Sequence, residues 1–376
     1  NLDYFDYCTG LRMTNDKFAD LFEGPRRDPE QLLTQREMDL AASVQVVVEK
    51  AVIALAKGLH KETGIKNLCL AGGVALNCVA NGKLLREEVF DNIWIQPAAG
   101  DAGGALGAAL QAYHGYKGGE RKPVNGSRDR MKGSYLGPTF EQEEIEKQLA
   151  ECGAKFHSFS TEDMLQKTAE ALANEKAVGW FQGRMEFGPR ALGGRSILGD
   201  PRSPSMQTTL NLKVKYRESF RPFAPSVLRD HVQDWFQMDG DSPYMLLVAP
   251  VKEDKCIEMT EEQKALFGIE KLKIPRSEIP AVTHVDYSAR VQTVHEDTNP
   301  LYHGLISRSH ALSQCPVVVN TSFNVRGEPI VCTPKDAFRC FMGTEIEVLV
   351  VGNTICFKEE QDEKLRLDYK NEFELD

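Results

Sequence analysis

Between Gly183 and Ser196 the chain reads GRMEFGPRALGGRS, directly after the apolar, strand-like run Val178–Phe181. Three arginines, four glycines and a proline share this short stretch. Glycine lets the backbone come close to a ligand, and the planar guanidinium of arginine matches the oxygens of phosphate or carboxylate. A solvated basic loop is the alternative, but it has no need of the apolar anchors Phe187 and Leu192. We therefore predict an oxyanion-binding loop with the candidate ligands Arg184, Arg190, Arg195 and Ser196.

A second basic segment, KVKYRESFRPFAP, spans residues 213–225. Lys213 alone would suit the end of a charged amphipathic helix. The aromatics and the two prolines that follow predict a rigid, partly buried turn, in which an unpaired guanidinium is costly unless an anion meets it. No general base is evident, so we predict catalysis by positioning and electrostatics. The candidate catalytic residues are Lys215, Arg217 and Arg221.

A third segment joins the apolar run Val317–Val319 to a polar turn, NTSFNVRGEP, at residues 320–329. Hydroxyl and amide side chains at the end of a strand commonly donate to a ligand. An ordinary turn whose side chains cap its own backbone explains any single residue equally well. As the functional alternative we predict that Ser322 and Asn324 donate to a carbonyl or phosphate group.

Upstream, Leu68–Ala71 reads as a buried strand and is followed by the pair Gly72-Gly73 and by a helical pattern at Ala75–Leu85. A strand, a glycine turn and a helix N-terminus together form a cradle for phosphate or nucleotide, because free backbone N–H groups and the helix dipole point at the ligand. We predict nucleotide contacts from this turn and the start of the helix, at Gly72, Gly73 and Asn77.

Asp101 follows the apolar run Asn92–Pro97 and precedes a helix of small residues. Two interpretations are equally open from its position. An acid there caps a helix N-terminus, or it is a carboxylate ligand to a metal ion or to nucleotide-bound Mg²⁺.

The remaining periodicity predicts an α/β (α+β) fold. Leu32–His60 reads as a core helix with one apolar stripe, and residues 116–133 read as a linker with Pro123–Gly126 as turn material. Further helices are expected at Glu141–Ala150 and Glu162–Asn174. Strands are expected at Ala177–Phe181, Tyr244–Pro250, Val291–Val294, Pro316–Val319 and Val348–Val351.

Composition excludes several classes of partner. The net charge of -10 disfavours nucleic acid, which binds mainly to positive surface, so the clustered arginines indicate a local pocket for a small anion. No run approaches the roughly 18 apolar residues of a membrane span. The nine cysteines lie mostly in apolar runs such as Leu68-Cys69-Leu70, and no CxxC pair is present. Buried, reduced thiols and a cytoplasmic location are therefore expected.

Taken in order, the motifs GRMEFGPRALGGRSILGDPR, YRESFRPFAPSV, HVDYSARVQTV and VVVNTSFNVRGEPIV resemble the O-carbamoyltransferases that modify nodulation factors and aminoglycoside or cephamycin antibiotics. The resemblance covers nearly the whole chain. It implies part of an actin-like, sugar-kinase-like domain at residues 1–120 and a YrdC-like α/β domain at residues 134–376. It also implies that carbamoyl phosphate and ATP, with Mg²⁺, form carbamoyl adenylate. The carbamoyl group would then pass to a hydroxyl on a small-molecule acceptor, and a homodimer is compatible with this view.

The family pattern also includes iron, or another divalent metal, held by an acid at the position of Asp101 and by two histidines spaced four apart. No histidine pair in this sequence has that spacing. The chain opens at Asn1 without a leading βαβ pattern, so we expect that the N-terminal half of the actin-like domain, with its metal ligands, lies outside this sequence.

Two other function classes stay open at this stage. The first is a sugar-kinase-like phosphotransferase, which the AGGVALN turn and Asp101 suggest but which leaves the arginine-rich half without a purpose. The second is a non-catalytic nucleotide-binding module, which the missing histidine pair favours.

Overall fold

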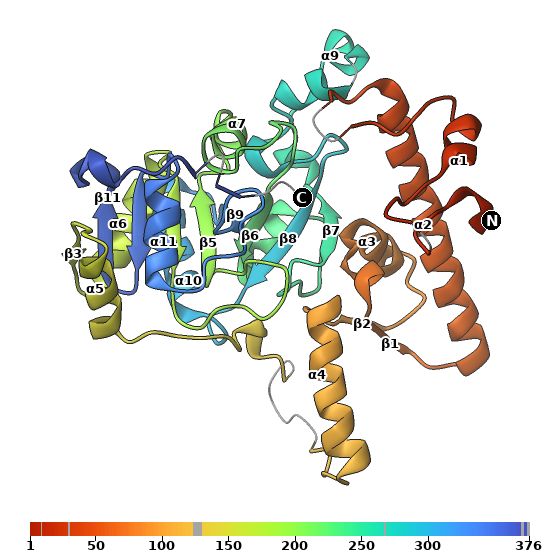
Figure 1. Cartoon of the computed structure of the whole chain (residues 1–376), viewed down its shortest axis with the longest axis horizontal. Coiled ribbons are helices and arrows are strands. Elements are labelled where there is room, and N and C mark those ends of the chain that lie inside the picture. The colour runs from red at the N-terminus through yellow and green to blue at the C-terminus, as the bar shows by residue number, and fades with distance from the viewer. Residues whose placement is uncertain (9, 29–30, 123–129, 267, 370–371, 374–376) are drawn as a thin grey trace. The chain divides into compact units, whose positions relative to one another are not determined.

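The structure, a computed structural model, describes residues 1–376 apart from 9, 29–30, 123–129, 267, 370–371 and 374–376. The chain divides into two compact units, Asn1–Val48 and Glu49–Asp376. The expected turn at Pro123–Gly126 falls outside the described residues. The architecture is mixed α/β, as predicted (Figure 1).

The unit Asn1–Val48 is small and helical. Helix α1 (Asp16–Leu21) starts at Asn15, whose side chain accepts a hydrogen bond from the Phe18 N–H at 3.3 Å. The Phe18 ring packs against Phe5 and Phe22, with ring centroids 5.9 and 4.6 Å away. Helix α2 (Gln35–Thr63) begins in this unit and ends in the next. The expectation of a core helix is wrong for this structure, because Leu55 is 74% exposed and the buried residues of α2 are Glu49 and Ala56.

The unit Glu49–Asp376 begins with a small parallel sheet of β1 (Asn67–Leu70) and β2 (Asn92–Ile95). A 3-10 turn (Gly73–Leu76) and helix α3 (Cys78–Arg86) connect them, and helix α4 (Asp101–Gln111) follows. The first strand was correctly predicted, but only Leu68 of β1 is buried and Cys69 is exposed, because one face of this narrow sheet is open. All nine cysteines are free thiols.

A mixed nine-stranded sheet carries the rest of the unit, in the order β3-β11-β10-β4-β5-β9-β6-β8-β7. The pairs β10/β4 and β6/β8 are parallel, and the other neighbours are antiparallel. The strands are β3 (His157–Ser158), β4 (Val178–Phe181), β5 (Arg195–Gly199), β6 (Ala224–Leu228), β7 (Leu247–Pro250), β8 (Ser288–Val294), β9 (Val317–Ser322), β10 (Val348–Val351) and β11 (Thr354–Phe357).

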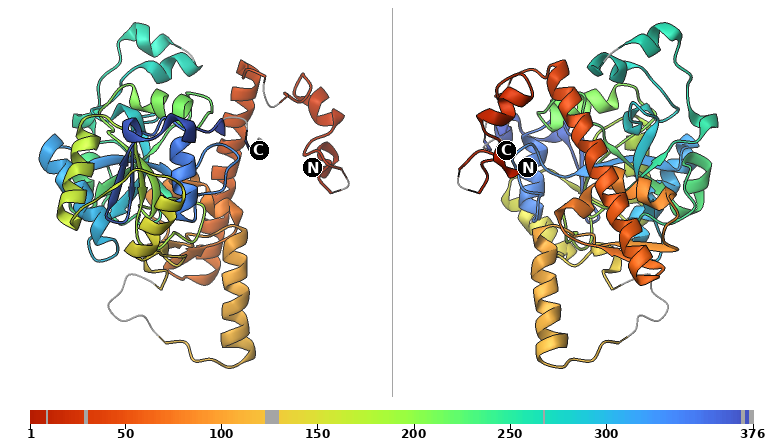
Figure 2. Two further views of the ribbon diagram at one scale, coloured as in Figure 1. Left: turned by 60° about the vertical axis from the view of Figure 1, so that its left-hand side comes forward. Right: turned by 90° about the vertical axis from the view of Figure 1, so that its right-hand side faces the viewer.

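Helices cover both faces of this sheet (Figures 1 and 2). Alternate residues of one strand point to opposite faces, so Val178 and Trp180 of β4 pack against α6 (Thr161–Ala173) and α10 (Pro300–Ser313). Phe181 belongs to the opposite core, with α5 (Gln142–Glu151) and α11 (Pro334–Met342). The short helices are α7 (Met206–Thr209), α8 (Val232–Trp235) and α9 (Glu261–Ala265).

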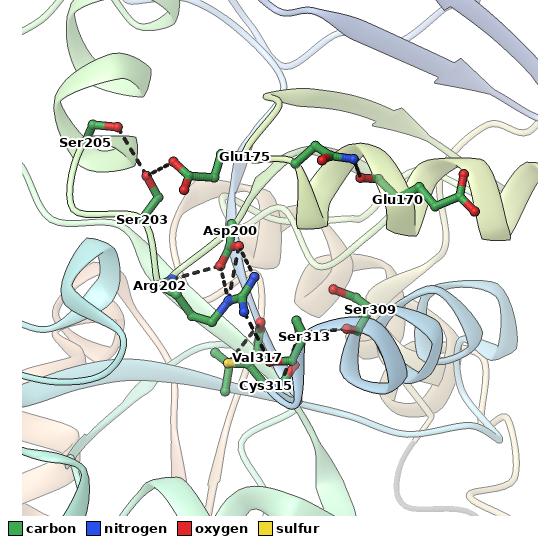
Figure 3. A network of polar contacts seen from close by, with 11 residues as sticks. Glu170, Glu175, Asp200, Arg202, Ser203, Ser205, Ser309, Ser313, Cys315 and Val317 are labelled. Atoms are coloured by element: carbon green, nitrogen blue, oxygen red, sulfur yellow. Dashed lines mark hydrogen bonds and ion pairs between the residues drawn. The ribbon is translucent and has the colours of Figure 1, made fainter.

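The polar segment after β5 is anchored to the end of α10 by one arginine (Figure 3). The Arg202 guanidinium donates to both oxygens of Asp200, at 2.6 to 3.2 Å, and Nη1 donates to the Ser313 carbonyl at 3.1 Å. A guanidinium satisfied in this way, by a carboxylate on one side and a carbonyl on the other, has a structural role. Other arginines of the chain can be compared with it by asking whether their guanidinium donors already have protein acceptors.

Two boundaries differ from prediction where it matters for the site. The loop predicted at residues 183–196 ends at Gly194. Strand β5 begins at Arg195, and its Ser196 pairs with Ser322 of β9. Strand β9 continues to Ser322 instead of ending at Val319, because its polar residues Asn320 and Thr321 still pair with β5. Both neighbouring strands therefore hold polar side chains in a strand ladder where a loop and a turn were expected.

Candidate functional site

The glycine-rich loop, the second basic segment and the third, polar segment meet at one pocket. A cavity of about 370 Å³ lies where the loop before β5, the segment before β6, the start of β8 and the end of β9 come together. Of the predicted ligands it brings together Arg190, Arg217, Arg221 and Ser322. Its other lining residues are Cys78, Pro189, Ala191, Pro222, Phe223, Ala224, Met245, His284, Arg290, Asn320 and Thr321.

The pocket carries a strong excess of positive charge. Its described lining contains four arginines and no aspartate or glutamate. Burial, reinforced by repulsion from Arg290, lowers the pKa of Arg190 to about 10, and burial with repulsion from Arg221 lowers the pKa of Arg217 to about 10. Burial also lowers the pKa of Arg290. Neighbouring cations that remain charged at neutral pH, with no acid in the described lining, favour the binding of an anion.

Individual contacts show which arginines have spare donors. The buried Nε of Arg190 has no hydrogen-bond partner in the described part of the chain. Arg217 donates through Nε to Asn211 Oδ1 at 2.7 Å, and its guanidinium lies 5.1 Å from the centre of the Phe223 ring, which leaves its Nη groups for a ligand. Arg221 is exposed and forms an ion pair with Glu218 at 3.0 Å. Arg190 and Arg217 therefore keep guanidinium donors for a ligand, whereas those of Arg202 are already used within the protein.

Sequence reasoning missed Asn320 and two titratable residues of the pocket, Arg290 and His284. Arg290 lies inside strand β8 between the buried Ala289 and Val291. A charged residue within an apolar run was the signal that could have identified Arg290. The motif HVDYSARVQTV that contains it was used only as a whole, for the family resemblance. Burial lowers the pKa of His284 to about 4, and its Nδ1 lies 3.1 Å from Ser288 Oγ. This histidine is therefore neutral at physiological pH.

Asn320 gives the pocket one acceptor among many donors. Its amide nitrogen donates to the Ala191 carbonyl, Ser226 Oγ and Gln292 Oε1, at 3.1, 3.0 and 2.8 Å. These acceptors fix the orientation of the amide, and its buried Oδ1 has no partner among the residues that the structure describes. A buried acceptor without a donor is costly, so a ligand that brings an N–H group would fit there.

Lys215 lies behind the pocket and is not part of its lining. The side chain is 3% exposed, and Nζ donates to Asn324 Oδ1 and to the Asn324 carbonyl, both at 2.8 Å, as well as to the Ser322 carbonyl and, at 3.2 Å, to Ser322 Oγ. Burial, with repulsion from Arg217, lowers the pKa of Lys215 to about 7. The predicted group of Lys215, Ser322 and Asn324 thus forms one connected corner, in which Ser322 reaches the pocket.

The other predicted ligands in the glycine-rich loop lie away from the pocket. Arg195 is completely buried, and its guanidinium donates to the carbonyls of Gln182, Gly183, Gly194 and Pro138 and stacks 3.5 Å above the Phe181 ring. Ser196 is buried and accepts a hydrogen bond from the Gly193 N–H at 3.0 Å. Arg184 is exposed and donates to the Gly137 carbonyl. Their observed contacts are those of loop anchors.

The loop itself is shaped by Glu186, a residue for which no role was predicted. Its buried carboxylate accepts hydrogen bonds from the backbone N–H groups of Leu192 and Gly194, both at 2.6 Å, and of Arg195 at 3.3 Å. A carboxylate that gathers three N–H groups folds the loop back on itself. This turn brings Arg190 to the pocket while Arg195 points into the core.

The upstream candidates lie on the small sheet. Gly72 has φ of 93°, and the space around Gly72 and Gly73 is open, as a close backbone approach by a ligand requires. Asn77 caps α3 by accepting a hydrogen bond from the Ala80 N–H at 3.1 Å. Asp101 is exposed in the first turn of α4, which Gly100 caps. Among the described residues no group of three His, Cys, Asp or Glu side chains could hold a metal ion.

The fold and the site define a mixed α/β protein with a pocket whose described lining has four arginines and no acid, which suits a small anion. Comparison with known families narrows this class. Residues 1–110 match the carbamoyltransferase N-terminus, and residues 169–358 match the carbamoyltransferase C-terminus. The chain belongs to the carbamoyltransferase family.

Several curated relatives are similar over most of this chain. An uncharacterized protein of Synechocystis sp. is 61% identical over 100% of this chain and 61% of its own length. The nodulation protein NolNO of Sinorhizobium fredii is 40% identical over 86% of this chain and 45% of its own length, and the nodulation protein NolO of Bradyrhizobium diazoefficiens is 41% identical over 85% and 54%. The chain thus spans only about half to three-fifths of the length of these relatives.

Among solved structures, full-length HypF in its phosphate- and nucleotide-bound form matches with 15% sequence identity and a TM-score of 0.35, over 70% of this chain and 36% of that one. This likeness is too distant to define the fold. In the described part of the chain no helix is both long and apolar enough to cross a membrane.

Proposed function

We propose that this chain holds the carbamoyl phosphate site of an ATP-dependent carbamoyltransferase and forms carbamoyl adenylate there. The observation that carries the proposal is a pocket lined by four arginines in which the buried Oδ1 of Asn320 has no partner. Carbamoyl phosphate matches both features, because its phosphate needs several cationic donors and its NH₂ group can donate to an amide oxygen.

The overall reaction consumes one water molecule. Hydrolysis of carbamoyl phosphate breaks its link to phosphate and gives carbamate and inorganic phosphate. A carbamate oxygen then attacks the α-phosphorus of ATP, a new P–O bond forms, and pyrophosphate leaves. One molecule each of phosphate and pyrophosphate should therefore appear for every carbamoyl adenylate formed.

The arginines contribute charge stabilisation in this scheme. Arg190 and Arg217 offer preorganised donors in a partly desolvated site, where each well-placed donor can stabilise developing charge by about 3 kcal/mol. The pocket is lined in its described part by one histidine, His284, which is neutral at physiological pH. We therefore assign the work of the site to positioning and electrostatics.

ATP, with its Mg²⁺, is part of the proposal, and the open Gly72-Gly73 turn is where the family resemblance would place a nucleotide. The resemblance also suggests iron for transfer to an acceptor hydroxyl. Asp101 alone does not fit such a site, because it is a single exposed carboxylate. The nine free thiols suit a reducing compartment, so we propose that the reaction is cytoplasmic.

The test is a product balance with the chain as given. Incubation with carbamoyl phosphate and ATP should release phosphate and pyrophosphate in equal amounts, and pyrophosphate release should stop when carbamoyl phosphate is omitted. ADP formed in place of pyrophosphate would point to a phosphotransferase. Nucleotide binding without pyrophosphate release from a folded sample would reject the adenylate-forming role.

A further inference from the structure

A buried chain of hydrogen bonds leads from the C-terminal segment to the corner formed by Lys215, Ser322 and Asn324. The Tyr369 hydroxyl donates to Glu328 Oε1 at 2.5 Å. Tyr369 is 3% exposed and Glu328 is 9% exposed, although both lie far from Lys215 in the sequence. Tyr369 also lies beyond residues 169–358, which match the family's C-terminal region.

Glu328 fixes the turn that carries Asn324. Its Oε2 accepts a hydrogen bond from the Val325 N–H at 2.8 Å, and its backbone carbonyl accepts one from the Asn324 amide nitrogen at 2.6 Å. The second bond sets which way the Asn324 amide points. Asn324 Oδ1 therefore faces Lys215 Nζ at 2.8 Å and Ser322 Oγ at 2.6 Å.

Tyr369 is itself held firmly in place. Its ring lies directly over Gly343, where an added Cβ would come within 2.3 Å of Tyr369 Cγ, so only glycine leaves room for it. The Phe373 ring packs edge to face against it, with the ring centroids 5.1 Å apart. A tyrosine wedged in this way presents its hydroxyl to Glu328 in one orientation.

We propose that Tyr369 and Glu328 are positioning residues of the anion site, and that the C-terminal segment thereby sets the orientation and charge of the Lys215 corner. This inference rests on the proposed function only in assigning the anion as carbamoyl phosphate. Two charged groups act on the Lys215 ammonium electrostatically: Arg217 repels it, whereas the Glu328 carboxylate favours its charge. Burial raises the pKa of Cys340 well above its usual range, so this thiol stays neutral and supplies no counter-charge.

The charge of Glu328 depends in turn on its donors. Burial raises the pKa of the Glu328 carboxyl, and the hydrogen bonds from Tyr369 and from the Val325 N–H oppose that shift. Removing the Tyr369 hydroxyl should make Glu328 easier to protonate. Lys215 would then lose a counter-charge, and its own pKa would fall further.

The experiment measures binding of sulfate by calorimetry between pH 6 and pH 9, with the full chain. Sulfate does not change its charge in this range, and the pKa of His284, at about 4, lies below it. In the unmodified chain affinity should fall as Lys215 loses its proton, with a midpoint near its pKa of about 7. Glu328→Gln should move that midpoint about one pH unit lower, and Tyr369→Phe should move it in the same direction by less.

The matched control is Tyr216→Phe. The Tyr216 hydroxyl donates to the Gly343 carbonyl at 2.8 Å, so this variant also loses a hydroxyl bond beneath the C-terminal segment, but not one to Glu328. It should keep the midpoint of the unmodified chain. Tyr369→Phe keeps the ring and its packing. This variant therefore still tests the proposal if Glu328→Gln does not fold.

An unchanged midpoint in Tyr369→Phe, or an equal shift in Tyr216→Phe, would overturn the positioning role. Pyrophosphate release is measured separately on the same samples. Shifted sulfate midpoints without pyrophosphate would reject adenylate formation and keep the positioning role. Failure of the unmodified chain to bind sulfate would overturn both.

Discussion

Arg217 and Arg221 are separated by three residues, yet the structure predicts very different effects when each is changed to alanine. Arg217 is partly buried, uses Nε for Asn211 and keeps its Nη groups for the pocket. A charge-assisted hydrogen bond to a desolvated anion contributes about 2 kcal/mol. Arg217→Ala should therefore weaken carbamoyl phosphate binding about 30-fold.

Arg221 is exposed and already paired with Glu218, so its contribution should stay below about 1 kcal/mol, or about fivefold in affinity. Calorimetric titration with carbamoyl phosphate compares the two variants, with Arg184→Ala as a control. Arg184 comes from the same family motif as Arg190 but does not line the pocket, so its variant should bind as the unmodified chain does.

Arg217→Ala also removes the bond to Asn211 and the contact with Phe223, so thermal unfolding must show that the variant is folded at the titration temperature. Equal losses for Arg217→Ala and Arg221→Ala would refute the reasoning from burial. A loss for Arg184→Ala as large as that for Arg217→Ala would place the anion on the other side of the loop.

Three further predictions follow from contacts described above. His284 stays neutral in the folded chain down to pH about 4, whereas in the unfolded chain it is protonated near pH 6.5. The free energy of unfolding should therefore fall by up to about 3 kcal/mol as the pH drops between these values. Denaturant titrations of His284→Gln should show a smaller fall over the same pH range. Arg195→Met leaves four carbonyls without their donor and should cost about 3 kcal/mol of stability with little change in anion affinity; the reverse pattern would make Arg195 a ligand. The chain should hold iron only weakly, and Asp101→Asn should not change its iron content; stoichiometric iron in elemental analysis that this variant loses would restore Asp101 as a ligand.

Local patterns predicted much of the fold, because apolar runs such as Val178–Phe181 and Val348–Val351 form central strands, buried on both faces. They could not show that the polar start of NTSFN continues as strand β9, since its pairing with β5 is a long-range contact. They also could not place α2, whose apolar stripe looks like that of a core helix although most of it is exposed here.

For the site, sequence reasoning found the right segments more reliably than the right side chains. Arg190 and Arg195 are equivalent by composition, and only the folding of the loop around Glu186 sends one to the pocket and the other into the core. Arg290 was missed because the motif around it was used only as a whole, although a charged residue inside an apolar strand was a signal. Lys215 was singled out, but its position behind Ser322 depends on contacts between distant segments.

Strand β7 is the last strand of the nine-stranded sheet, and helix α3 covers it closely. Arg86 donates to the Val248 carbonyl at 3.0 Å, and at Gly82 even a methyl group would lie 2.2 Å from the same oxygen. An uncovered edge strand is a template for aggregation. A shortened protein that starts after residue 133 would keep every arginine of the pocket but lose this cover. It should therefore be prone to edge-to-edge association, so solubility will decide whether the C-terminal region can be handled alone.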